Sequence, residues 1–144
     1  MKKLSLVLLL LLCACCLVFV QGCTSRKDLF SEALDMIGKG VPSGWIEENG
    51  SYWSTSNFRF GKEFMIANVN GLIVEQVMVI CAFANNADQY RWLKESYDTL
   101  IADNWELILD DDDTWAFMKE DKLATGVSDD NDGTPMASVV FIQR

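Results

Sequence analysis

The sequence predicts an α+β domain: an antiparallel sheet with two helices on one face, built from two helix-plus-four-strand repeats. Segments 24–38 and 87–103 carry apolar residues at helical spacing. The rest of the chain after residue 44 is rich in β-branched and aromatic residues, and Asn-Gly or Asp-Gly pairs, which favour tight hairpins, interrupt it. Elements of the same kind also recur at an offset of 60 to 62 residues.

The first helix is expected between Thr24 and Gly38. Ser25 is a good N-cap, and Asp28 three residues later approximates a capping box. Glycine and proline residues after position 37 end the helix. Its apolar residues share one face: Phe30, Leu34 and Ile37.

Four strands are expected after this helix. Turns at Asn49-Gly50 and Asn70-Gly71 and a break at Gly61-Lys62 separate them. The last of the four is the most apolar and is therefore expected at the centre of the sheet. The predicted strands are 45–48, 52–60, 64–69 and 72–83.

The second helix is expected between Ala87 and Asp103, with Asn86 as its N-cap and Gln89 three residues later. Its charged residues lie off an apolar stripe, and that stripe is expected to pack on the sheet. The stripe consists of Tyr90, Leu93, Tyr97, Leu100 and Ile101.

The remaining strands are expected at 105–109, 114–119, 122–128 and 137–143, with turns at 110–113, 120–121 and 129–133. Segments 25–83 and 86–143 then form two pseudo-repeats in which Trp45 and Trp105 occupy equivalent places. This order of elements resembles β-lactamase-inhibitor-protein-like and PepSY-like lipoproteins. The resemblance covers residues 25–143 but lies in element order alone. It implies a protein that binds other proteins or sits in the cell envelope.

The N-terminus has the layout of a secretory signal, with basic Lys2 and Lys3, an apolar run at 4–20 and a small residue before Cys23. Val20-Gln21-Gly22-Cys23 resembles the lipobox of bacterial lipoproteins. The resemblance implies a signal peptide at 1–22, a diacylglycerol on Cys23, and a single domain at 23–144 held at the membrane by that lipid. It favours the outer membrane if the cell is Gram-negative.

Two alternatives remain for the N-terminus. The leader stays uncleaved and anchors a single-pass membrane protein, although its apolar run of 17 residues is shorter than the roughly 20 that span a bilayer. Otherwise an ordinary signal is cleaved and Cys23 is a free thiol.

Charge and composition exclude several functions. Without residues 1–22 the chain carries 10 basic and 21 acidic residues, a net charge of −11. Nucleic acid is therefore not an expected partner. The chain has no histidine and no motif of a known nucleophile or phosphate loop, so we expect neither enzymatic activity nor a cofactor. Cys81 is the one cysteine after Cys23, and its apolar surroundings predict a buried, inert thiol.

Two groups of residues are candidates for binding. Aspartates in the predicted turns supply the oxygen ligands that calcium prefers, which gives the alternative of a calcium-binding structural envelope protein using Asp110, Asp112, Asp130 and Asp132. Aromatic residues on the sheet face away from the helices are expected to form a recognition surface: Tyr52, Trp53 and Trp115. The sequence therefore predicts a lipid-anchored, non-enzymatic binding or assembly module whose partner is an envelope protein.

Overall fold

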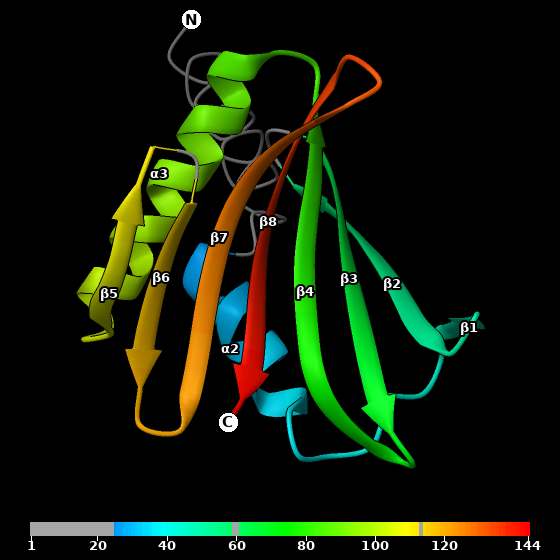
Figure 1. Ribbon diagram of the computed structural model, residues 1–144. Helices are drawn as coiled ribbons and strands as arrows, with labels where there is room; N and C mark the ends of the chain where they lie inside the picture. Colours follow the sequence, from blue (N-terminus) through cyan, green and yellow to red (C-terminus); the bar gives the residue numbers. More distant parts are fainter. Residues whose placement is uncertain (1–24, 59–60, 113) are drawn as a thin grey trace, which may run out of the picture.

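The computed structural model describes residues 25–58, 61–112 and 114–144 (Figure 1). These residues form an α+β domain with two helices and one open eight-stranded antiparallel sheet, as predicted. The segment predicted to be a lipobox, with Cys23, lies outside the described residues. Within the described residues, no helix is both long and apolar enough to cross a membrane. The helices are α2 (Arg26–Met36) and α3 (Asn86–Ala102), and the strands are β1 (Ile46–Glu48), β2 (Ser51–Phe58), β3 (Gly61–Asn70), β4 (Ile73–Phe83), β5 (Glu106–Asp111), β6 (Thr114–Lys119), β7 (Lys122–Asn131) and β8 (Thr134–Gln143).

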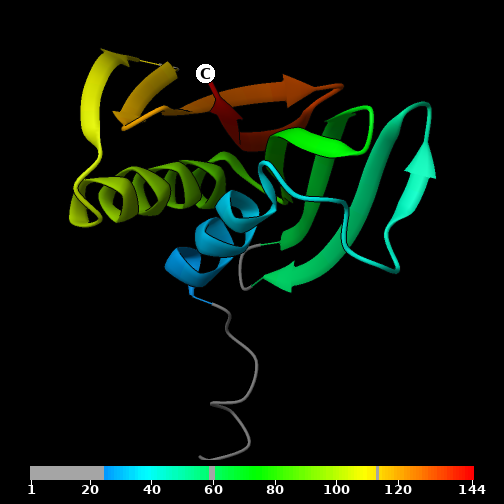
Figure 2. The same cartoon turned by 90° about the horizontal axis from the view of Figure 1, so that it is seen from below.

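The strand order is β1-β2-β3-β4-β8-β7-β6-β5, so the short β1 and the six-residue β5 are the two edges. The strands β4 and β8 pair at the centre, where Val79 lies opposite Val139. Helix α2 contacts β4, helix α3 contacts β4, β7 and β8, and the two helices contact each other (Figure 2).

Both helix starts follow from their side chains. The Ser25 hydroxyl accepts a hydrogen bond from the Asp28 backbone N–H at 3.1 Å, which confirms the predicted N-cap of α2. Helix α3 begins one residue earlier than predicted, because Asn85 rather than Asn86 is its N-cap. The Asn85 side-chain oxygen accepts from the Asp88 backbone N–H at 2.9 Å, and its amide donates to the Asp88 carboxylate at 3.0 Å. These two bonds tie the N-cap to the third residue of α3, although a capping box would use the Asn85 backbone N–H for the second bond.

Several hairpins match their predicted positions, but the predicted break at Gly61-Lys62 is wrong, because both residues pair with β2. Asn49-Gly50 and Asp132-Gly133 take the left-handed conformation at both residues, which a two-residue hairpin of this type requires. The prediction of Asn70-Gly71 as the central turn residues is wrong by one position. Asn70 still pairs with Ile73, so Gly71 and Leu72 form the β3–β4 loop.

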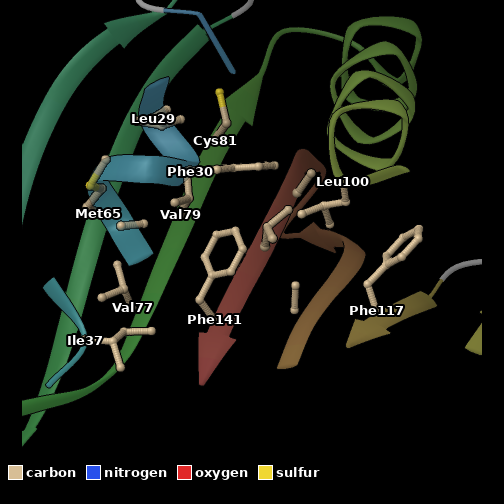
Figure 3. Packing of buried hydrophobic residues seen from close by; sticks show 14 of the residues in the cluster. Leu29, Phe30, Ile37, Met65, Val77, Val79, Cys81, Leu100, Phe117 and Phe141 are labelled. Carbon is tan, nitrogen blue, oxygen red and sulfur yellow. The ribbon is translucent and has the colours of Figure 1, made fainter. Parts of the chain in front are cut away.

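Alternation of burial divides the sheet into two sides. On β4 and β8, Val77, Val79, Val139 and Phe141 are fully buried and pack against residues of α2 such as Phe30 (Figure 3). The Phe30 and Phe141 rings meet edge to face at 5.1 Å between centroids. We call the side that carries these residues the core side and the opposite side the outer side.

Helix α3 buries a different face from the predicted stripe. Its buried residues are Trp92, Ser96 and Leu100, whereas Tyr90 is 71% exposed and Ile101 is 48% exposed. Trp92 determines which face of α3 is buried, because its ring packs edge to face on the Phe83 ring with 6.1 Å between centroids. The stripe was expected to meet the sheet along its whole length, and that expectation is wrong for Tyr90 and Ile101.

Candidate functional site

A buried ionic cluster ties the start of α2 to α3. The Arg26 side chain is buried although sequence rules place arginine at the surface. Its guanidinium lies 4.3 Å from the centre of the Trp92 ring, donates to the Ser96 hydroxyl at 3.2 Å and approaches the Glu95 carboxylate to 3.5 Å. These contacts hold the two helices together, so we assign the cluster a structural role.

Cys81 lies beside this cluster on the core side of β4. Its side chain is fully buried, as predicted, and it pairs across the sheet with Glu63, which is also buried. Burial first, and then the negative charge of Glu63, raise the pKa of the Cys81 thiol to about 12. The thiol is therefore protonated at neutral pH and is a poor nucleophile.

The outer side of the sheet carries large apolar side chains where a one-sided sheet usually carries polar ones. The register places Trp53, Ile66, Met78 and Val140 side by side across four neighbouring strands. Each of these side chains is partly buried. We define the outer apolar face as Trp53, Phe64, Ile66, Met78, Ile80, Met118, Leu123, Val127, Met136, Val140 and Ile142.

The three aromatic residues of the predicted recognition surface do not share one side. Trp53 pairs with Ile66 and belongs to the outer apolar face. Tyr52 pairs with Ala67 and packs against the core. Trp115 is 7% exposed, pairs with Gly126 and joins the core cluster.

Trp115 instead reaches a groove of about 480 Å³ between α3 and the β5–β6 hairpin. Three rings line the groove, and Asp110 to Asp112 face it from the hairpin. In the sequence, this site was indicated by the stripe residues of α3 that do not enter the core and by the run of aspartates at 110–112. We call it the α3 groove; its lining residues are Asn86, Gln89, Tyr90, Leu93, Lys94, Tyr97, Asp98, Asp110, Asp111, Asp112, Trp115 and Ser128.

The floor of the α3 groove depends on a glycine. A Cβ atom on Gly126 would lie 2.1 Å from Cζ2 of Trp115, so the Trp115 ring lies directly over the β7 backbone. The same ring meets Tyr97 edge to face at 6.0 Å and Phe117 at 5.4 Å. These neighbours hold the Trp115 ring in one position.

The charges along the α3 groove are unbalanced. Lys94 pairs with Asp98 at 2.6 Å, and this hydrogen bond raises the pKa of the Lys94 ammonium group. The Tyr97 hydroxyl donates a long hydrogen bond of 3.4 Å to Asp110. Burial, followed by the negative charge of Asp110, raises the pKa of Tyr97. Asp110, Asp111 and Asp112 form no ion pair within the part of the chain that the structure describes.

The aspartates proposed to bind calcium lie at different levels of the sheet. Asp129 and Asp130 belong to β7 rather than to a turn, because they pair with Met136 and Pro135. Thr114 at the start of β6 pairs with Val127, so Asp130 lies three residues, about 10 Å, further along the sheet. Among the described residues, no three His, Cys, Asp or Glu side chains cluster to hold a metal ion.

No family model, curated protein or solved structure matches this chain. The two features of the described residues that bear on function are the outer apolar face and the α3 groove. The outer apolar face offers apolar area without reactive groups. The α3 groove offers aromatic rings beside carboxylates.

Proposed function

We propose that the protein is a lipid-anchored lipoprotein of the bacterial cell envelope, whose domain acts as a non-enzymatic binding or assembly module. The observation that carries this proposal is the outer apolar face. Large apolar patches on a soluble domain mark interaction sites. Covering the exposed part of one such side chain contributes at most roughly 0.5–1 kcal/mol, so several together stabilise a complex.

The partner that we propose is an envelope protein with a complementary apolar surface. Two acidic residues that lie beside the outer apolar face and outside the α3 groove are Glu106 and Asp129. With the net charge of the chain, these residues disfavour nucleic acid and anionic lipid as the occupant. A protein surface with basic groups around an apolar centre fits both features.

We further propose that α2 and α3 both cover the core side of the sheet and that the domain arose by duplication. Contacts of both helices with β4, and their place within the curve of the sheet in Figure 2, support the first point. The strand order supports the second, because two four-strand meanders meet at β4 and β8 and a helix precedes each of them.

This arrangement gives the anchor a role in orientation. Cys23 precedes Arg26, the first residue of α2, by three residues, which reach at most about 10 Å. In Figure 2 this end of α2 points away from the sheet. A lipid on Cys23 would therefore hold the helices near the bilayer and direct the outer apolar face away from it.

Site-specific photo-cross-linking in cells tests the proposal. A photoreactive residue at Met78, at the centre of the outer apolar face, should cross-link to one defined envelope protein. The matched control is the same residue at Glu32, which is exposed on α2. Equal cross-linking from both positions, or none from position 78, would contradict the proposed binding surface.

A further inference from the structure

We propose that the α3 groove binds an organic cation, an ammonium or guanidinium group carried by a basic peptide or a free amine. This inference goes beyond the proposed function, because the groove and the outer apolar face share no residue. Either proposal can therefore fail while the other holds.

The first support is that part of the apolar stripe of α3 does not pack in the core. Trp92, Ser96 and Leu100 of α3 are buried in the core, whereas Tyr90 is 71% exposed and lines the wall of the groove. Tyr97, one further residue of the same stripe, is half-buried and lies between the core and the groove. The stripe thus brings aromatic rings to a cavity instead of to the sheet.

The second support is charge. Four carboxylates and one ammonium group line the groove, and the ammonium group of Lys94 is already paired with Asp98. The hairpin on the other wall leaves Asp110, Asp111 and Asp112 without a cationic partner among the described residues. A cavity lined by one sign of charge concentrates ions of the opposite sign.

The third support is the fixed floor, which distinguishes this site from an acidic turn. Trp115 is more than nine-tenths buried, and its indole N–H donates to none of the described residues. Because Trp115 lines the groove, an oxygen atom of an occupant, such as a peptide carbonyl, could accept a hydrogen bond from this N–H. Gly126 allows the ring to lie flat against the strand, so the floor is formed before any ligand binds.

Aromatic rings beside carboxylates select an organic cation over a metal ion. Ring faces attract ammonium and guanidinium groups within about 6 Å, and the carboxylates accept their N–H groups. Calcium requires six to eight oxygen ligands around one point, and among the described residues no three carboxylates lie close enough together to hold a metal ion. The N–H donor of Trp115 favours a cation that carries a neighbouring carbonyl group.

Calorimetric titration of the protein purified from membranes in detergent tests the proposal. The probes are arginine amide, spermidine as a free amine, a short arginine-containing peptide, and calcium. Citrulline amide is the neutral control, because it keeps the shape of arginine amide without its charge. We expect saturable binding of arginine amide and at least about tenfold weaker binding of citrulline amide. The peptide and spermidine arms distinguish the two sources of the cation.

Matched variants locate the binding. Asp110→Asn with Asp111→Asn removes two charges from the groove and should weaken arginine amide binding about tenfold. Asp130→Asn with Asp132→Asn removes two charges from the neighbouring β7–β8 hairpin, outside the groove, and should change it less than about twofold. Equal binding of citrulline amide, equal weakening by both double variants, or binding of calcium in place of arginine amide would overturn the proposal.

Discussion

Replacing Gly126 by alanine tests whether the Trp115 ring is held as the structure shows. The new Cβ would lie 2.1, 2.2 and 2.6 Å from three atoms of the ring, whereas ordinary contact begins at 3.4 Å. The ring must therefore move by at least about 1.3 Å, and Tyr97 and Phe117 restrict that movement. Overpacking of this kind costs about 1–3 kcal/mol of the free energy of unfolding.

The sign of the effect should reverse when the ring is absent. Gly126 does not have a positive φ, so alanine is compatible with its backbone. In a Trp115→Leu background, Gly126→Ala should stabilise the protein by about 0.4–1 kcal/mol, because alanine restricts the unfolded chain. The coupling energy between the two positions should therefore be about 1.4–4 kcal/mol.

Urea denaturation followed by circular dichroism measures all four proteins of this cycle without relying on tryptophan emission. A cost of Gly126→Ala that is the same in both backgrounds would show that the Trp115 ring does not cover Gly126. A change smaller than about 0.5 kcal/mol in the native background would contradict the reasoning in the same way.

Three further predictions concern other parts of the chain. The mass of the mature N-terminus should show a lipid-modified Cys23; an unmodified thiol or a retained leader would contradict the proposed anchor. The Cys81 thiol should not react with a thiol reagent at pH 8 until urea unfolds the protein, because it is buried and its pKa is about 12; fast reaction of the folded protein would show an open site. The pKa of Asp103 is lowered from 3.8, mainly by the hydrogen bond that Lys119 donates to it and further by the positive charge of Lys119. The Asp103–Lys119 pair therefore stabilises the folded state above pH 3.8, and this effect is lost as the pH falls through the lowered pKa. Asp103→Asn should thus cost less than about 1 kcal/mol at pH 7 and nothing at pH 2 in urea unfolding, and a cost that persists at pH 2 would contradict the ionic origin.

Local features of the fold were predictable because local chemistry determines them. The Ser25 cap and the hairpins at Asn49-Gly50 and Asp132-Gly133 follow from side-chain hydrogen bonds and from residues that tolerate positive φ. Asp129 and Asp130 were assigned to a turn because aspartate favours turns, but pairing with β8 extends β7 through both.

Features that depend on packing were harder to predict. Trp92 lies one position off the apolar stripe of α3, and its size outweighs the stripe in setting which face is buried. Arginine is usually exposed, so the burial of Arg26 was not expected from its residue type. The ring and the hydroxyl group that stabilise it belong to α3, which is far from Arg26 in the sequence.

The two candidate surfaces left different signals in the sequence. The unbroken apolar runs at 77–80 and 139–142 lack the alternation of a one-sided sheet, and this was the available signal for the outer apolar face. The α3 groove joins a helix to a hairpin through the position of Trp115, so pattern alone could not place its rings and carboxylates together.

The most direct test of the central claim, that the outer apolar face docks an envelope protein, compares two charges placed on one strand. Met78→Glu lies at the centre of this face, and Gln76→Glu lies on the same side of β4 at its polar margin. The measurement is the size of the native complex in detergent-solubilised membranes, with urea unfolding as the control for folding. The account predicts that Met78→Glu loses the complex while remaining folded and that Gln76→Glu keeps it. A complex that survives Met78→Glu, or one that both variants lose, would contradict the claim.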